Sequence, residues 1–165
     1  MGLNRLPKYV WRWLIEEAPT DLVAALPRDV HLRDVSDGDY PELRARIETV
    51  LGGFIGEKGD RRGLATATKM LHLKRPELLP ICDSYTVAML GIPLKPDASK
   101  PERIAAGLAA CDITQQAVRE NAAELDAVCE HLAQQAYPRT PVRVLDALLW
   151  LAYGGNIRPG RPRRR

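Results

Sequence analysis

The sequence predicts an all-α fold, a single globular domain of about seven or eight helices. Apolar residues recur at three- and four-residue spacing through most of the chain, and helix-start signals alternate with glycines and prolines that end helices. No segment forms a convincing strand. With 165 residues, 45% hydrophobic and 27% charged, the chain is long enough for one buried core. We assign residues 1–157 to this domain and residues 158–165, with five arginines, to a basic tail that is disordered when free.

Three helices and one extended connector are expected in the first third of the chain, the helices over residues 8–17, 20–25 and 39–51 and the connector over residues 28–35. Thr20 is placed to cap the second helix, and residues 39–42 form a capping box for the third. Apolar and polar residues alternate in the connector, but an isolated strand is poor structure, so an extended segment is favoured. Gly52 and Gly53 are expected to end the third helix.

The middle of the chain, residues 59–90, is the segment that the other helices are expected to surround. A glycine-rich loop ending at Gly63 turns sharply and brings its backbone close to a ligand. A thin helix over residues 64–73, rich in alanine and threonine, follows the loop. A proline-bracketed turn then leads to Asp83, which is placed to cap a helix ending near Leu90.

Three further helices are expected in the last third of the chain, over residues 100–110, 113–132 and 141–153. Ser99 and Glu102 form a capping box for the first of them. Asp112 is placed to cap the second, predicted to be the longest in the chain. Apolar residues occupy nearly every side of the final helix, so we expect it to be central.

The composition argues against several classes of protein. Cys82, Cys111 and Cys129 are widely spaced and form no C-x-x-C pair, so neither a disulfide framework nor a zinc site is expected. The histidines are not spaced as metal ligands, and no cofactor is expected. No segment has the roughly 20 apolar residues of a membrane span, and the N-terminus lacks the pattern of a signal peptide. We therefore expect a cytoplasmic protein with reduced cysteines and no membrane partner.

Basic residues cluster in the glycine-rich loop and in the helix after it, at Lys58, Arg61, Arg62 and Lys69. Clustered cations attract an anionic partner, and amides at a helix N-terminus after a tight turn bind phosphate. DNA or another nucleic acid is the partner that fits both features. An ordinary solvated surface explains the same charges equally well.

Gly63, the pair Thr66-Ala67 and Asp83 form one motif with a known counterpart. They resemble the helix-hairpin-helix DNA glycosylase superfamily, in which a hairpin of the form G-x-G-x-x-T-A precedes a D-[TS]-H motif. A closer resemblance, over roughly the C-terminal two-thirds of the chain, is to the DUF6308 family, and it is carried by residues 67–76, 80–84, 143–146 and 149–150. That family implies no established activity.

The chain also departs from the glycosylase superfamily. Arg61 replaces the first hairpin glycine, which alters the turn, and Tyr85 stands where a histidine is common. Ala65 stands where bifunctional members carry a nucleophilic lysine, so Schiff-base lyase chemistry is excluded at that position. The four cysteines that hold an iron–sulfur cluster in some members are absent. The resemblance therefore implies a hydrolase without lyase activity.

These features together predict a nucleic-acid-binding helical domain that hydrolyses an N-glycosidic bond of a flipped-out base. Asp83 is the expected catalytic carboxylate. Nucleic-acid binding is assigned to Lys58, Arg61, Arg62, Gly63, Thr66 and Lys69, and a pocket to His72, Ser84 and Tyr85.

Structural alternatives stand beside each assignment. Asp83 is a preferred cap residue and more often does nothing else, and His72 more often packs or hydrogen-bonds near the connector. Arg143 and Asp146, three apart on the last helix, are expected to form a structural ion pair. Two other functions remain open: a non-catalytic binding or interaction module, and an enzyme on a small nucleoside-like or nucleotide-like substrate. The oligomeric state does not follow from the sequence.

Overall fold

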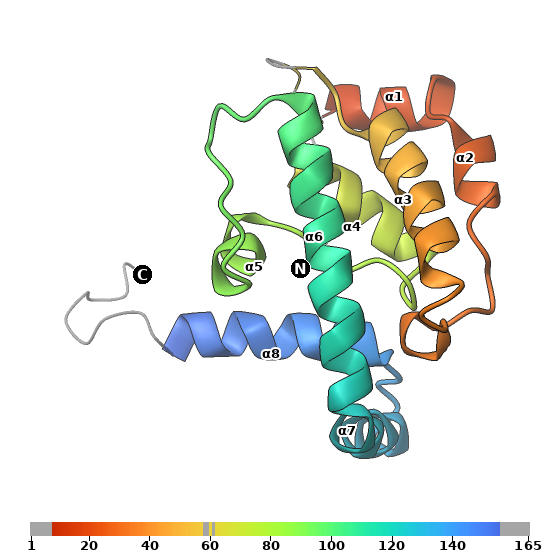
Figure 1. Ribbon diagram of the computed structural model, residues 1–165, viewed down its shortest axis with the longest axis vertical. Helices are drawn as coiled ribbons and strands as arrows, with labels where there is room; N and C mark the ends of the chain where they lie inside the picture. The colour runs from red at the N-terminus through yellow and green to blue at the C-terminus, as the bar shows by residue number, and fades with distance from the viewer. Residues whose placement is uncertain (1–7, 58–59, 61, 156–165) are drawn as a thin grey trace.

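The computed structural model describes residues 8–57, 60 and 62–155, and these ranges are helical without any strand (Figure 1). The same ranges contain eight α-helices and one 3-10 helix: α1 (Lys8–Glu16), α2 (Thr20–Ala24), η2 (Leu32–Asp34), α3 (Tyr40–Phe54), α4 (Leu64–Lys74), α5 (Ser84–Met89), α6 (Lys100–Glu120), α7 (Ala122–Gln134) and α8 (Pro141–Gly155). The predicted all-α class and number of helices are confirmed. No helix of the described chain is long and apolar enough to cross a membrane. The predicted basic tail, residues 158–165, lies outside the described residues.

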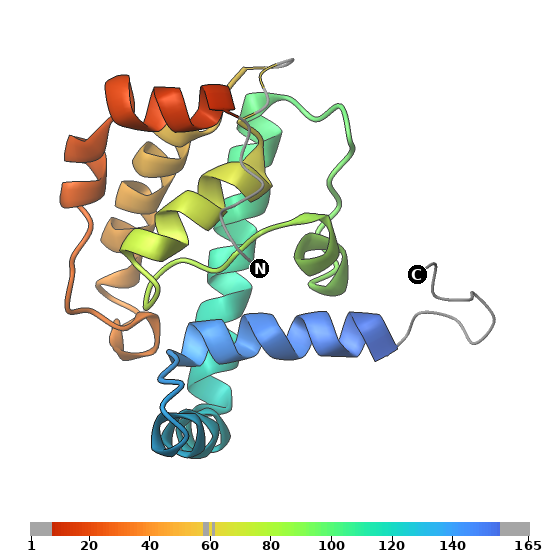
Figure 2. The ribbon, with the colours of Figure 1, turned by 180° about the vertical axis from the view of Figure 1, so that it is seen from behind.

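Helix α6 is the axis of the fold. Helices α3, α4 and α8 and the 3-10 helix η2 all pack against it, and α2 packs against α3 on the outer side (Figures 1 and 2). Trp13 of α1 meets Phe54 of α3 edge-on, with ring centroids 5.4 Å apart. At Gly107 of α6 an added Cβ would be only 3.0 Å from Cδ1 of both Leu51 and Leu64. A glycine here therefore lets α3 and α4 approach α6 closely.

Helix α3 shows how the apolar pattern produces the core. Its buried residues are all apolar and recur mainly at spacings of three and four, namely Leu43, Ile47, Val50, Leu51 and Phe54. The opposite side of the helix carries charged residues, including the ion pair between Arg46 and Glu42. Each such buried aliphatic or aromatic side chain contributes about 1.5–3 kcal/mol relative to full exposure, so the pattern directs α3 to one orientation.

Two predicted helix caps are wrong. Thr20 lies inside α2, whose N-cap residue is Pro19 and which has no side-chain cap. Asp39 precedes α3 but makes no cap hydrogen bond, because its backbone is already helical, whereas a capping side chain needs an extended backbone to reach the first amides. Instead, the carboxylate of Asp39 accepts a hydrogen bond from Ser36 Oγ at 2.5 Å.

The predicted helix boundary at Asp112 is also wrong. Helix α6 runs without interruption from Lys100 to Glu120, and the break before α7 falls at Asn121. The Asp112 carboxylate accepts hydrogen bonds from Tyr40 Oη at 2.8 Å and Arg44 Nε at 2.9 Å. Asp112 therefore ties α6 to α3 in the middle of the helix. The capping box of Ser99 and Glu102 at the start of α6 is present as predicted.

Gly52 and Gly53 lie within α3, which they were predicted to end. A Cβ at Gly52 would have Ile104 Cδ1 as its nearest contact at 3.9 Å, whereas a Cβ at Gly53 would lie 2.7 Å from Leu22 Cδ1 and 3.0 Å from Pro19 Cγ. We expect Gly52→Ala to raise the free energy of unfolding by about 0.5–1 kcal/mol, because alanine restricts the unfolded chain and favours the helix. Gly53→Ala is the matched control and should lower that free energy in urea titrations. Equal shifts in the two variants would contradict this packing.

Helix α8 is not the central helix that its apolar sequence predicted. It crosses the lower end of α6 in Figure 1, and its C-terminal half lies against α5 and extends past it (Figures 1 and 2). Thr140 Oγ1 holds its start, donating to the Pro76 carbonyl at 3.0 Å and accepting from the Arg143 amide at 3.1 Å. Val142 and Val144 are buried, whereas Leu148 and Leu151 are exposed. The apolar composition of α8 therefore reflects burial within this chain only in part.

A buried arginine joins α4 to α2. The guanidinium of Arg75 donates to the carbonyl oxygens of Leu26 at 3.1 Å, Val23 at 2.8 Å and Lys74 at 2.7 Å. Val23 lies in the last turn of α2 and Leu26 just beyond it, where the helix no longer supplies every carbonyl with an amide; the Val23 carbonyl also accepts from the Leu26 amide at 3.2 Å. The positive charge therefore lies at the negative end of the α2 dipole and anchors this five-residue helix.

Candidate functional site

A cleft opens between the N-terminal ends of α4 and α6, helix α5 and the loop that follows α5. Its volume is about 430 Å³, which lies in the range of small-molecule sites, about 300–1,000 Å³. Its walls are mainly aliphatic, and the groups that offer hydrogen bonds or charge are Asp60, Gly63, Asp83, Ser84, Lys95 and Arg103. Three predicted site residues, Gly63, Asp83 and Ser84, therefore line one cavity.

Asp83 is held rigidly at the start of α5. Its side chain is 7% exposed, and its backbone is extended, as a cap requires. The Oδ1 atom accepts hydrogen bonds from the amides of Tyr85 at 3.1 Å and Thr86 at 3.0 Å, and from Thr86 Oγ1 at 3.3 Å. The predicted cap is thus present. All three of these bonds end on one carboxylate oxygen, so they orient the group while Asp83 also lines the cleft.

The N-terminus of α4 lies at the same cleft. Gly63 is its N-cap residue, with extended backbone angles, and no side chain caps this end of the helix. Gly63, Leu64 and Ala65 all line the cavity. The partial positive charge of an eleven-residue helix therefore lies at the wall that Asp83 shares.

The connector before Asp83 is fixed by side chains from two other helices. Thr68 Oγ1 of α4 accepts a hydrogen bond from the Cys82 amide at 3.0 Å and donates to the Leu64 carbonyl at 2.9 Å. Asp146 Oδ2 of α8 accepts a hydrogen bond from the Ile81 amide at 3.1 Å. The two amides that precede Asp83 are thereby satisfied, and the position of Asp83 depends on α4 and α8 together.

Asp146 is a buried carboxylate close to Asp83 that sequence reasoning treated only as half of an ion pair. Its ion pair with Arg143 exists, with Arg143 Nη1 3.8 Å from Asp146 Oδ2. Burial, with a smaller effect of the charge of Asp83, raises the pKa of Asp146 to about 7 against the opposing effects of the Ile81 amide and Arg143. The 62 residues between Asp83 and Asp146 carry no spacing signal that predicts this proximity.

The cations of the cleft differ from those predicted. Lys95 and Arg103 line it, although neither belongs to a basic cluster in the sequence. Arg62 instead pairs with Asp60, with Nη2 2.6 Å from Oδ2, and its guanidinium lies 4.3 Å from the ring centroid of Trp13. The hydrogen bond from Arg62 lowers the pKa of Asp60, so this carboxylate stays ionised. Its negative charge compensates the positive charge of Arg62. Lys58 and Arg61 lie outside the described residues.

Four other predicted site residues do not line the cleft, namely Thr66, Lys69, His72 and Tyr85. His72 is buried at the far end of α4, where its Nδ1 lies 2.6 Å from the Leu79 carbonyl oxygen. That carbonyl can only accept, so Nδ1 carries the proton. Burial lowers the pKa of His72, which keeps the ring neutral near pH 7. Tyr85 is exposed and meets Trp150 edge-on, with ring centroids 4.9 Å apart.

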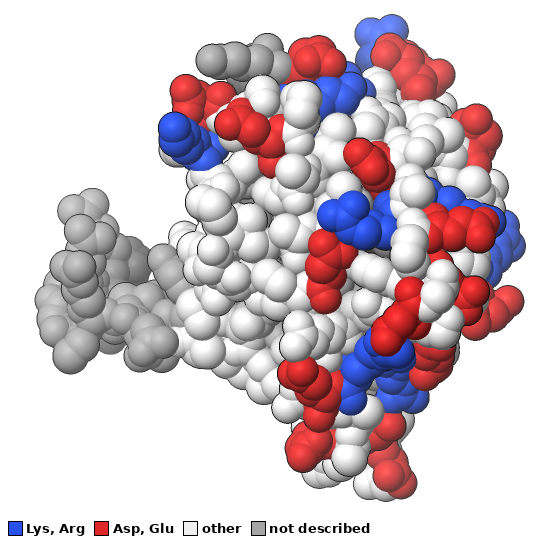
Figure 3. Space-filling model, viewed as in Figure 1, with Lys and Arg blue, Asp and Glu red and all other residues white. Residues whose placement is uncertain are grey.

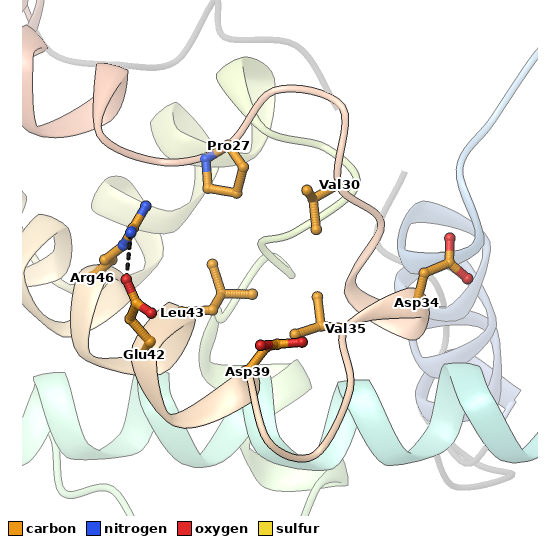
Figure 4. A pocket seen from close by; sticks show the side chains of 8 residues that line it. All are labelled: Pro27, Val30, Asp34, Val35, Asp39, Glu42, Leu43 and Arg46. Atoms are coloured by element: carbon orange, nitrogen blue, oxygen red, sulfur yellow. Dashed lines mark hydrogen bonds and ion pairs between the residues drawn. The ribbon is translucent and has the colours of Figure 1, made fainter.

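A second hollow, of about 340 Å³, lies between the 27–35 connector and α3 (Figure 4). Val30, Val35 and Leu43 point into it. Its rim is charged, but Arg46 pairs with Glu42 and Asp39 accepts from Ser36. Most of the polar groups here are already paired locally, which makes the hollow a weaker candidate site. No cluster of potential metal ligands occurs within the described ranges.

The fold and the cleft together define an all-helical domain whose cavity combines an oriented carboxylate, a helix N-terminus without a side-chain cap and two cations. The chain belongs to the DUF6308 family, a family of unknown function, which matches residues 9–153. The sequence-based resemblance to that family is thereby confirmed. No curated protein and no solved structure matches the chain.

Proposed function

We propose that the cleft at Asp83 binds a nucleobase with its sugar from a nucleic acid and hydrolyses the N-glycosidic bond between them. The observation that carries this proposal is the presence of Gly63 and Asp83 in the wall of one cavity. An aliphatic cavity suits an uncharged, flat base, and the polar groups at its edge suit the sugar and phosphate. The proposal keeps the resemblance of residues 63–83 to the helix-hairpin-helix glycosylases.

Asp83 would act on the sugar through Oδ2, because Oδ1 is occupied by its three donors. As the bond between C1′ and the base nitrogen breaks, the electron pair leaves with the base and positive charge develops on the sugar ring. The carboxylate stabilises that charge. It then accepts a proton from the water whose oxygen bonds to C1′, while the departing base takes a proton from solvent. Ala65 in the cleft wall offers no amine, so lyase chemistry does not follow.

Phosphate binding would come from the backbone as much as from side chains. The first amides of α4 have no side-chain cap, and such amides bind phosphate without base specificity. Arg103 and Lys95 add charge within the cleft. Lys69 and the residues before Gly63, among them Lys58 and Arg61, would provide further contacts to the phosphates of the nucleic acid.

A small nucleoside-like or nucleotide-like substrate is the second candidate. The observation that favours it is the pairing of Arg62 with Asp60 and Trp13, which leaves two cations in the part of the cleft that the structure describes. Two cations suffice for one phosphate but provide few contacts for a duplex backbone. A non-catalytic binding module is the remaining alternative, in which Asp83 only caps α5.

The test compares the wild type with Asp83→Asn, which keeps a good N-cap but loses the charge. We expect base release from oligonucleotides carrying a panel of modified bases, detected as strand cleavage by alkali, to fall at least about 100-fold in the variant. Binding of the same oligonucleotides, measured by fluorescence anisotropy at about 50 mM salt, should be retained. Free nucleosides and nucleotides assayed in parallel distinguish the second candidate.

Asp97→Asn is the matched control, because Asp97 is an exposed aspartate in the loop that borders the cleft and is not part of its wall. It should retain both base release and binding. Undiminished base release in Asp83→Asn would exclude the catalytic role. Absence of binding at low salt, the most permissive condition, would exclude a nucleic-acid partner.

A further inference from the structure

Two segments without any charged residue meet on one face of the molecule. Residues 84–94 and 147–157 each contain eleven consecutive residues without Asp, Glu, Lys or Arg, the two longest such runs in the chain. The described parts of these runs are α5 with its following loop and the second half of α8, and α5 packs on α8. In Figure 3 the middle-left surface, where α5 and the second half of α8 lie in Figure 1, is white, whereas charged residues gather on the right and at the upper edge.

This face exposes large apolar side chains. Leu148 is 47% exposed, Leu151 is 71% exposed, and Tyr85 is 41% exposed beside Trp150. Ala147 and Ala152 are exposed on the same side of α8. A helix that is apolar on nearly all sides is ordinarily covered, and an exposed apolar patch without charges is typical of the centre of a protein interface.

We propose that a second copy of this chain covers the face, with the C-terminal halves of two α8 helices packed against each other about a two-fold axis. A nucleic acid does not suit the face, because its phosphates require cations that both charge-free segments lack. A second copy suits the face because two identical faces without charged residues do not repel each other when they meet. The leucines at 148 and 151 also lie beside the small side chains of Ala147 and Ala152.

Antiparallel pairing about a two-fold axis level with the middle of residues 147–152 sets Leu148 of each copy against Leu151 of the other and Ala147 against Ala152, and the small alanines allow close approach of the axes. The two-fold axis closes the assembly at a dimer, because the same patch is used on both copies. The interface lies next to the cleft, on the outer side of α5, and uses Tyr85 rather than the cleft residues Ser84 and Ala88. This inference does not depend on the proposed reaction.

The test is sedimentation velocity of the full chain from about 1 µM to about 100 µM. The wild type should sediment as a species of twice the chain mass at the upper end of this range. Leu148→Glu/Leu151→Glu should weaken the association at least about 100-fold, because each substitution places an unpaired charge in the interface twice. Circular dichroism establishes that the variant retains its helices.

Leu73→Glu on α4 and Ile15→Glu on α1 are the matched controls, since each replaces an exposed apolar side chain outside this face with a charged one. They should associate as the wild type does. A second measurement requires no variant: on dilution, backbone amide shifts of the wild type should change in α5 and α8. A wild type that is monomeric throughout, controls that weaken association as strongly, or shifts confined to other helices would each overturn the proposal.

Discussion

Between about pH 4 and pH 7 the wild-type protein is expected to lose about 4 kcal/mol of unfolding free energy relative to Asp146→Asn. The folded state raises the pKa of Asp146 to about 7 through burial. Below pH 4 this carboxyl is protonated in both the folded and the unfolded chain. Between pH 4 and pH 7 the unfolded chain releases the proton while the folded chain keeps it, so stability falls as pH rises. Above pH 7 both states are ionised and the difference becomes constant.

Urea titrations of both proteins across this pH range measure the effect, because the other carboxylates contribute equally to both curves. Asparagine keeps an oxygen for the Ile81 amide, so the fold is retained. Arg143→Met supplies a further check. Since Arg143 lowers the pKa of Asp146, its removal should move the transition to higher pH. Parallel stability curves for the wild type and Asp146→Asn would show that the carboxyl is not held in its neutral form.

Arg75→Met is expected to lower the free energy of unfolding by about 3 kcal/mol or more. The substitution keeps the length of the side chain but removes the guanidinium hydrogen bonds to the carbonyls of Val23, in the last turn of α2, and Leu26, just after it. Hydrogen bonds from a charged group contribute about 1.5–3 kcal/mol each. Amide hydrogen exchange should show the loss first in α2, which has five residues and no side-chain cap.

Two substitutions distinguish this anchor from a general charge effect. Lys74→Met removes an adjacent, exposed cation and should change stability by no more than about 0.5 kcal/mol. Arg75→Lys keeps the charge but replaces the planar group that reaches three carbonyls, so it should recover only part of the loss. A fully stable Arg75→Met would show that α2 is held by its apolar contacts alone.

The sequence predicted helices well where the signal was local. The capping box of Ser99 and Glu102 and the cap by Asp83 both appear, because a cap needs only residues a few positions apart. The prediction for Asp112 failed for the opposite reason. Its carboxylate bonds to Tyr40 and Arg44 on α3, and no pattern within α6 reveals partners some 70 residues away in the chain.

The candidate site, too, was predicted correctly only where the signal was local in the sequence. Gly63 and Asp83 were singled out from a short motif, and both line the cleft. Arg103, which lines the cleft, and Asp146, which holds the connector before Asp83, were not predicted, because only tertiary packing brings α6 and α8 to these places. Arg62 was expected to bind an anionic partner, yet it forms an ion pair with Asp60, two residues earlier in the chain. Helix α8 was judged from its composition, which cannot distinguish burial within a chain from burial between chains.

Cys82 gives the cleft a chemical property of its own. Its amide is bonded to Thr68, its thiol donates to the Pro80 carbonyl at 3.7 Å, and burial raises the pKa of the thiol well above its usual value. A thiol attacks or is oxidised as the thiolate, so the sulfur is inert while the connector stays in place. With only 1% of Cys82 exposed, peroxides and alkylating agents should react faster with it when the connector that carries Asp83 moves away from α4. The reaction rate of this thiol therefore measures local opening at the wall of the cleft.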